Sequence, residues 1–259
     1  MITAIREERL LVVSDIHLGN PLYRRRHRFV DFLRFARQNG YPVCINGDGV
    51  DIVQNSIARL RHDLRGCNRE FAQFAARGLP IYYTVGNHDI VLEQFLDDWG
   101  VVRVAPFLNV DSGERRIRIE HGHIYDEMFV KYPRTYDVIT VLGSAMLRVS
   151  PALFRATSIL NTALVALGEW RHGSHRAADD AARLAEVIPG ERPVTIRAAQ
   201  EIAERGFDAV IFGHTHRAGQ VELSGGAWYY NTGVWESDPY YAEIDDGRVT
   251  LRSVSSIAA

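Results

Sequence analysis

The first half of the chain alternates short apolar runs with amphipathic stretches. The apolar runs have the length of buried strands, and the amphipathic stretches carry apolar residues at helical spacing. Within residues 28–38, for example, Phe29, Phe32, Leu33 and Ala36 fall on one helical face. The predicted strands are Leu10–Ser14, Tyr41–Asn46 and Ile81–Val85, and the predicted helices are Arg28–Gln38, Glu70–Arg77 and Ile90–Trp99. This alternation is typical of an α/β fold in which helices cover a sheet.

The pattern changes after Val101. Short strands are predicted at Val102–Val110 and Arg115–Glu120, and the chain is again rich in β-like runs from Ala209 onward. The dipeptide Asp246-Gly247 has the composition of a tight hairpin turn, so we expect it to close the last hairpin.

A long, mostly helical segment, residues 126–207, lies between these β regions. The dipeptide Ser150-Pro151 is a typical helix start. We therefore expect a single domain over residues 1–259 with this segment inserted as a helical cap. Apolar residues recur in it at helical spacing, among them Leu153, Leu160, Leu164 and Leu167. They would either pack the core of the cap or accept an apolar ligand or a membrane surface.

Composition limits the class of protein. The 259 residues are 46% hydrophobic and 24% charged, which is close to the averages of globular proteins. The net charge of −2 argues against sequence-independent binding of nucleic acid. Cys44 and Cys67 form no CxxC pair, which fits a reducing compartment. The first ten residues lack the shape of a signal peptide, and the uncharged stretches Val138–Leu147 and Ala156–Gly168 are too short to span a bilayer. We therefore expect a cytoplasmic protein, and no motif identifies a protein partner.

Six of the ten histidines lie in short segments that also contain Asp, Asn or Gly and that follow apolar strands. These segments are Ser14–Gly19, Gly86–Asp89, His121–His123 and Gly213–His216, and a fifth polar segment without histidine, Asn46–Asp51, also follows an apolar strand. The carboxyl ends of neighbouring strands in an α/β sheet meet at one edge. The five segments are therefore expected to form one shared site.

The residue types in this set indicate a metal site. Asp15, Asp48 and Asn87 would supply oxygen ligands, and imidazole nitrogens would come from His17, His121, His214 and His216. Seven ligands exceed one tetrahedral site, and a carboxylate at Asp48 could bridge two cations about 4 Å apart. We expect two divalent ions, for which the mixed nitrogen and oxygen ligands are compatible with Mn²⁺, Fe, Zn, Ni or Co, and a phosphorylated substrate.

In this order the five segments resemble the motifs of the calcineurin-like metallophosphoesterase superfamily: DxH, GDxxD, GNHD, a His before Gly, and GHTH. The resemblance implies a four-layer αββα sandwich with the metals at the sheet ends. It also implies that one metal is bound by Asp15, His17, Asp48 and His216, and the other by Asp48, Asn87, His121 and His214. The resemblance, together with the mixed ligand set, favours Mn²⁺ over Fe, Zn, Ni or Co, and the nucleophile would be metal-bound hydroxide. His88 would contact or protonate the leaving oxygen, and Asp51 would orient it.

Other polar residues near these motifs have two interpretations each. His123 would contact phosphate or the surrounding ligands, or it is a solvated loop histidine. Arg217, which follows the GHTH motif, is a candidate substrate-binding residue. The basic run Arg24, Arg25, Arg26 and Arg28 would bind a second phosphate or solvate a helix start. The remaining histidines, His27, His62, His172 and His175, are expected on solvated surfaces.

Within the superfamily the layout most resembles the UDP-2,3-diacylglucosamine pyrophosphatase group, which cleaves a lipid A precursor to lipid X and UMP. The resemblance rests on chain size, the helical insertion, the sequence Gly213–Arg217, and the closing segment Tyr230–Trp235 with Tyr240–Asp245. It implies peripheral membrane contact through the cap. The chain departs from that group at His88, where the group often has Arg, and at His123 and Val234, where it often has Asp.

The alternatives are a phosphodiesterase or phosphomonoesterase acting on another nucleotide, lipid or sugar phosphate, and two functions without catalysis. One of these is an interaction scaffold, which should have lost ligands or the acid. The other is a membrane-surface binding module.

Overall fold

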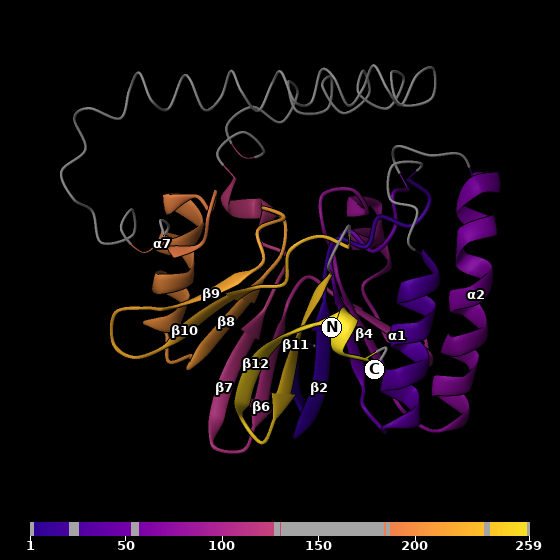
Figure 1. Cartoon of the computed structure of the whole chain (residues 1–259), viewed down its shortest axis with the longest axis horizontal. Coiled ribbons are helices and arrows are strands. Elements are labelled where there is room, and N and C mark those ends of the chain that lie inside the picture. The colour runs from indigo at the N-terminus through magenta and orange to yellow at the C-terminus, as the bar shows by residue number, and fades with distance from the viewer. Residues whose placement is uncertain are drawn as a thin grey trace.

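Two six-stranded sheets form the centre of the molecule (Figure 1). The first sheet has the order β1-β6-β7-β8-β10-β9, and the second has the order β12-β11-β2-β3-β4-β5. The strands of the first sheet are β1 (Ala4–Arg6), β6 (Leu108–Ser112), β7 (Arg115–Ile119), β8 (Ala209–Phe212), β9 (Gly219–Glu222) and β10 (Trp228–Asn231). Those of the second are β2 (Arg9–Val13), β3 (Val43–Asn46), β4 (Ile81–Thr84), β5 (Val102–Ala105), β11 (Tyr240–Asp245) and β12 (Arg248–Ser253).

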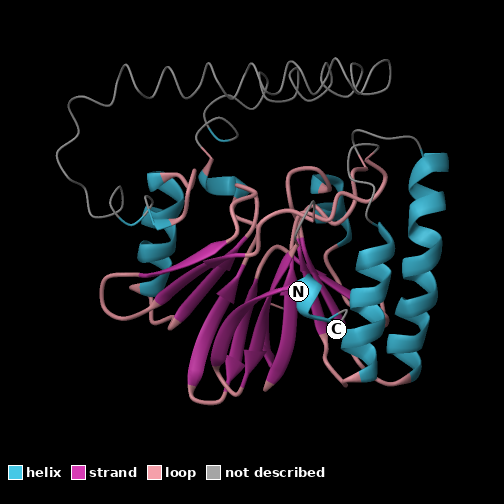
Figure 2. Ribbon diagram, in the orientation of Figure 1, coloured by secondary structure: helices cyan, strands magenta, loops and turns pink. Residues whose placement is uncertain are grey.

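Helices cover the outer faces of both sheets (Figure 2). The helices α1 (Arg26–Gln38) and α2 (Ile57–Ala76) pack on the second sheet, and α7 (Pro193–Ala203) packs on the first. Three short 3₁₀ helices complete the described elements: η1 (Ile90–Phe95), η2 (His123–Tyr125) and η4 (Val254–Ile257). The predicted α/β class and the sandwich of two helix-flanked sheets are confirmed.

Three apolar layers hold the sandwich together, and strand periodicity assigns residues to them. In β2, Leu11 and Val13 face the helices, whereas Leu10 and Val12 face the other sheet. Successive side chains on a strand point to opposite faces, so a strand buried on both faces is apolar at every position. The continuous apolar run in the sequence therefore reflects a strand buried between a helix layer and a second sheet.

The structure describes residues 3–20, 26–52, 57–126, 130, 184, 187–235 and 239–257 and is a computed structural model. Most of the predicted cap, with its helix start at Ser150-Pro151 and its leucine stripe, lies outside those residues. So do Arg24, Arg25, His172, His175 and the two uncharged stretches. None of the helices in the described part of the chain combines the length and the hydropathy that a membrane span requires.

Local predictions were accurate where one face of an element is buried. Phe29, Phe32, Leu33 and Ala36 of α1 are all fully buried, as the helical spacing predicted. The turn Asp246-Gly247 joins the paired strands β11 and β12, with both residues at positive φ. These features are confirmed.

Three predicted boundaries were wrong. The single strand Val102–Val110 is two strands in different sheets, because Pro106, which has no N–H to donate, lies where the chain crosses between them. The helix at Glu70–Arg77 begins much earlier, at Ile57, and the polar composition of its first half hid that start. The helix Ile90–Trp99 is only the six-residue η1, which has no fully buried residue to stabilise a longer helix.

The topology brings the five polar segments together. In the second sheet β2, β3 and β4 are neighbouring parallel strands, and in the first sheet β7 and β8 are neighbouring parallel strands. Each polar segment follows the carboxyl end of one of these five strands. Asn46 joins the two edges, because its amide nitrogen donates to the carbonyl oxygens of Glu120 (3.0 Å) and Ile211 (3.3 Å) in the other sheet.

Candidate metal centre

The backbone is strained where the candidate ligands lie. Among the described residues, six that are not glycine have positive φ, and five of these are candidate metal ligands: Asp15, His17, Asp48, His214 and His216. A non-glycine residue in this region costs about 1–3 kcal/mol and persists only where the surroundings over-determine it. The concentration of such residues in these loops indicates a functional site.

Hydrogen bonds between loops impose this backbone geometry. The first loop continues the pairing of β2 with β3 beyond the strands: the amides of Asp15 and His17 donate to the carbonyls of Gly47 (3.1 Å) and Asp48 (2.9 Å). The Trp235 amide donates to the Asp15 carbonyl at 3.0 Å. The loops therefore support each other, and their side chains are pre-positioned.

Two glycines allow the loops to approach closely. A Cβ atom at Gly86 would overlap the Asp48 carboxylate, and one at Gly213 would overlap the Asp15 carboxylate. Neither glycine has positive φ, so the requirement is space and not backbone conformation. Any side chain at these positions would displace a buried carboxylate.

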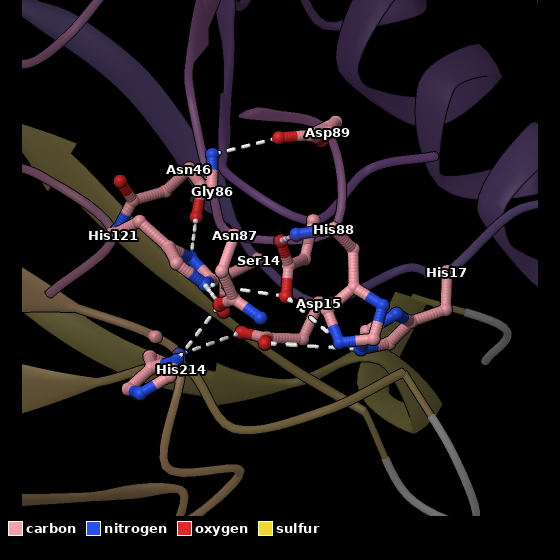
Figure 3. Close-up of polar contacts among 12 residues, drawn as sticks. Ser14, Asp15, His17, Asn46, Gly86, Asn87, His88, Asp89, His121 and His214 are labelled. Atoms are coloured by element: carbon pink, nitrogen blue, oxygen red, sulfur yellow. Dashed lines mark hydrogen bonds and ion pairs between the residues drawn. The ribbon is translucent and has the colours of Figure 1, made fainter. Parts of the chain in front are cut away.

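One group of candidate ligands is formed by Asp15, His17 and His216 (Figure 3 shows the first two). The Nε2 atom of His216 lies 3.1 Å from Oδ1 of Asp15 and 3.3 Å from Nε2 of His17. His17 Nδ1 lies 2.7 Å from Oδ1 of the Asp51 carboxylate, which fixes the proton on Nδ1. The Nε2 atom of His17 then carries a lone pair directed toward the other two residues.

A second group is centred on His121 (Figure 3). His121 Nδ1 lies 2.9 Å from the Asn46 carbonyl oxygen, which can only accept, so the proton is on Nδ1. The opposite nitrogen, Nε2, lies 3.2 Å from Asn87 Oδ1 and 3.3 Å from Asp48 Oδ2. The Nδ1 atom of His214 lies 3.0 Å from the same Asn87 oxygen. Four potential acceptors therefore converge on one small region.

This convergence is what a cation site requires. Lone pairs that face each other repel unless a proton or a metal ion lies between them, and mixed imidazole and carboxylate donors suit divalent transition metals. Asp48 belongs both to a group with His17 and His88 and to a group with Asp15 and His121, so it lies within reach of both clusters. The residues present therefore fit a pair of divalent ions.

The charges of the buried side chains also indicate a site that binds cations. Burial alone would raise the pKa of Asp48, but the neighbouring His121 and His88 hold it well below its usual range. Burial alone would lower the pKa of His121, but the Asp48 and Asp15 carboxylates raise it to about 10. Without a metal, protonated imidazole therefore compensates the buried carboxylates, and a metal ion would replace those protons.

His88 is less buried than the carboxylates beside it. Its side chain is 21% exposed, whereas the Asp48 and Asp51 side chains are 2% exposed and fully buried. His88 Nδ1 lies 3.2 Å from Asp51 Oδ1, and its Nε2 lies 3.9 Å from Asp48 Oδ2. Burial would lower the pKa of His88, but the Asp48 and Asp51 carboxylates raise it to about 9. Asp51 thus contacts both His17 and His88, whereas the sequence assigned it to His88 alone.

The other polar residues considered in the sequence differ in how exposed they are. His123 is 5% exposed, so the interpretation as a solvated loop histidine is wrong. Its ring lies 5.5 Å from that of His121, and burial together with the charge on His121 lowers its pKa to about 3. Arg217 is exposed and its guanidinium lies against Gly190. His27 and His62 are exposed, as expected.

Sequence reasoning missed several residues that hold the site. Asp89 accepts hydrogen bonds from the amides of Gly49 (3.0 Å) and Gly86 (2.7 Å), and burial raises its pKa to about 6. Glu191 accepts from Thr215 (3.0 Å) and Asn231 (3.2 Å) beside the GHTH loop. Asp89 lies within a quoted motif and could have been assigned, whereas no pattern marks Glu191.

A family model of the calcineurin-like phosphoesterases matches residues 8–218, which include all five polar segments. The chain belongs to this family. Membership makes it a hydrolase of phosphoester bonds, and the ligand groups support binding of divalent metal ions by this calcineurin-like phosphoesterase.

The calcineurin-like phosphoesterase is also similar to solved structures, all at low identity. A dimetal phosphatase from Danio rerio is 15% identical, with 95% of each chain covered and a TM-score of 0.47. A novel archaeal phosphodiesterase is 15% identical, with 95% of this chain and 98% of that chain covered and a TM-score of 0.45. A predicted phosphoesterase from Streptococcus pneumoniae is 14% identical, with 95% and 88% covered and a TM-score of 0.41. A search of curated proteins found no match.

We predict that metal binding releases protons near neutral pH. The raised pKa of His121 keeps its imidazole protonated, and a ligand must be neutral, so apparent affinity should increase about tenfold per pH unit for each proton released. Calorimetric titration of metal-free protein with Mn²⁺ in buffers of different ionisation enthalpy measures this release. The exposed His62 offers a control: His62→Ala should release as many protons as the wild type, and His121→Ala fewer. Heats that do not depend on the buffer would contradict the prediction.

Proposed function

We propose that this phosphoesterase is a dinuclear metal-dependent hydrolase of phosphoester or pyrophosphate bonds, with His88 as general acid and Asp51 as the carboxylate that orients it. The observation that carries the proposal is the convergence of the acceptor atoms of Asp48, Asn87 and His121 beside a partly exposed histidine. The candidate ligands would hold the ions, and the 21% exposure of the His88 side chain would let it reach a bound substrate.

In this proposal some side chains bind the metal ions, and His88 transfers a proton. When bound, a pair of divalent ions would lower the pKa of water and neutralise the phosphoryl oxygens. Asp51 Oδ1 lies 3.2 Å from His88 Nδ1 and holds a proton there, and the raised pKa of His88, about 9, favours the imidazolium, in which Nε2 carries a proton as well. His88 Nε2 then donates this proton to the leaving oxygen as the P–O bond breaks. The backbone amide of His88 donates to Asp48 Oδ1 at 2.8 Å, so the acid and a metal ligand keep a fixed separation.

The proposed metal is Mn²⁺. Oxygen ligands from two carboxylates and an amide, with imidazole nitrogens and no thiolate, suit Mn²⁺ and also Fe, Zn, Ni and Co. Metal analysis of purified protein, followed by reconstitution of metal-free protein with each ion, distinguishes them.

The proposed substrate is UDP-2,3-diacylglucosamine, cleaved at its pyrophosphate to lipid X and UMP. Support comes from the sequence resemblance in Gly213–Arg217 and Tyr230–Trp235. In the structure the second of these segments lies against the metal loops: Thr232 Oγ1 is 2.7 Å from Ser14 Oγ, and Asn231 donates to the Gly213 carbonyl at 2.9 Å. An acylated substrate would also bring the protein to a membrane surface.

We predict that Asp48→Ala abolishes activity and releases both metals together, because one carboxylate would bridge the two ions. The measurement is metal content per chain after gel filtration. Asp31→Ala serves as a control, since that side chain is 62% exposed and pairs with Arg34 on the helix surface. Loss of only one metal from Asp48→Ala would contradict the bridging role.

For His88→Gln we predict unchanged metal content and a turnover that falls on the order of 10²–10⁴-fold, the usual contribution of general acid catalysis. The loss should be largest for a poor leaving group, which needs a proton, and smallest for p-nitrophenolate. Turnover of alkyl and p-nitrophenyl esters by wild type, His88→Gln and the control His62→Gln tests this. Equal losses for both leaving groups would remove His88 from proton transfer.

We predict that Mn²⁺-loaded protein prefers UDP-2,3-diacylglucosamine to bis-p-nitrophenyl phosphate and p-nitrophenyl phosphate, and releases UMP. Initial rates over this panel, with the lipid nucleotide in detergent micelles, measure the preference. Hydrolysis of the simple esters alone would contradict the lipid substrate while keeping the dinuclear mechanism. In that case other nucleotide, lipid or sugar phosphates become the candidates. Metal-loaded protein that cleaves no ester would favour a scaffold or a membrane-binding function.

A further inference from the structure

The two nitrogens of the His214 ring face different partners. Nδ1 lies 3.0 Å from the Asn87 side-chain oxygen, inside the candidate metal centre. Nε2 lies 3.2 Å from Oδ2 of Asp126, whose side chain is 12% exposed. A carboxylate can only accept, so Asp126 places the proton of His214 on Nε2 and leaves a lone pair on Nδ1. That is the tautomer in which Nδ1 can bind a metal ion.

The same carboxylate oxygen has a second partner. Arg192 Nη1 donates to Asp126 Oδ2 at 2.8 Å. The two residues are far apart in the sequence and flank the segment 127–191, so the chain on both sides of that segment meets at the Asp126 carboxylate, which contacts His214. Glu191, next to Arg192, is 8% exposed and accepts a hydrogen bond from Tyr229 at 2.9 Å, which anchors this part of the chain on β10.

We propose that Asp126 is a positioning residue for the metal centre, and that it acts by orienting His214 while Arg192 holds its carboxylate in place. The proposal rests on the proposed function, in which His214 binds one of two metal ions. A hydrogen bond from the second nitrogen of a metal-binding histidine to a carboxylate fixes the ring and raises its basicity, and its loss typically costs 10–100-fold in metal affinity or activity.

The arrangement predicts that Asp126 contributes more to metal affinity than Arg192 does. Asp126 is mostly buried and contacts His214 directly, so its removal frees the imidazole to rotate or to change tautomer. The side chain of Arg192 is 52% exposed, and exposed ion pairs contribute little. Arg192→Ala should therefore weaken metal binding by about fivefold at most.

The experiment is calorimetric titration of metal-free protein with Mn²⁺, for wild type, Asp126→Ala, Asp126→Asn, His214→Ala and the double variant Asp126→Ala/His214→Ala. Asp126→Ala should weaken one of the two binding events by about 10–100-fold and leave the other within about threefold. Asp126→Asn keeps an acceptor oxygen and should recover part of the loss. In the His214→Ala background Asp126→Ala should have no further effect, because the proposed action of Asp126 on the metal passes through the imidazole.

A matched control separates positioning from general destabilisation. Asp98→Ala removes a partly exposed ion pair, 3.0 Å from Arg103, outside the metal centre, and should leave both binding events unchanged. Thermal unfolding of all metal-free variants checks that they are folded. A ¹⁵N spectrum of the imidazoles in metal-free protein should show the Nε2–H tautomer for His214 in wild type and a mixture in Asp126→Ala.

Failure of the positioning role and failure of the proposed function would give different results. If His214→Ala loses one metal and Asp126→Ala binds both like the wild type, the positioning role is overturned and the proposed function stands. The same conclusion follows if Asp126→Ala weakens binding equally with and without His214. If His214→Ala itself binds both metals normally, His214 is not a ligand, and both the ligand assignment in the proposed function and the positioning role fail.

Discussion

Two carboxylates buried side by side are the constraint on which the site depends. Asp15 and Asp48 are 0% and 1% exposed, and an uncompensated buried charge costs roughly several kcal/mol. Imidazoles surround both: His216 lies 3.1 Å from Asp15, and His121 lies 3.3 Å from Asp48. Protonated histidine supplies the compensating charge when no metal is bound, and a divalent ion supplies more of it in a smaller volume. The affinity for cations therefore follows from how the carboxylates are buried.

This burial is possible because strand ends from two sheets meet. Either sheet alone brings only part of the ligand set to its edge, and the Asn46 amide joins the edges through the carbonyls of Glu120 and Ile211. Strain of about 1–3 kcal/mol at each of several ligand positions would disfavour such loops in isolation. Hydrogen bonds between the loops, such as that from the His17 amide to the Asp48 carbonyl, offset it. The apolar cores on the faces of the sheets support the strands from which these loops extend.

Two carboxylates, each in contact with two partners, also position groups beside the candidate metal ligands. Asp51 contacts both His17 and His88, so the orientation of a candidate metal ligand and that of the proposed general acid depend on one group. Asp126 in the same way contacts His214 and Arg192. Because each carboxylate contacts two partners, a few buried charges position several side chains. A substitution at one residue of such a network therefore also affects its neighbours.

The sequence by itself determined the parts of the protein that depend on short-range pattern. Apolar runs marked the strands because these strands are buried on both faces, and the polar segments after them marked the site because parallel strands end at a common edge. The tertiary structure decided what depends on distant contacts. It split the strand at Pro106 between two sheets, gave Asp51 a second partner in His17, and brought Asp126 and Glu191 to the GHTH loop. Asp126 and His214 are separated by 88 residues, and no local periodicity encodes a contact made by packing across that distance.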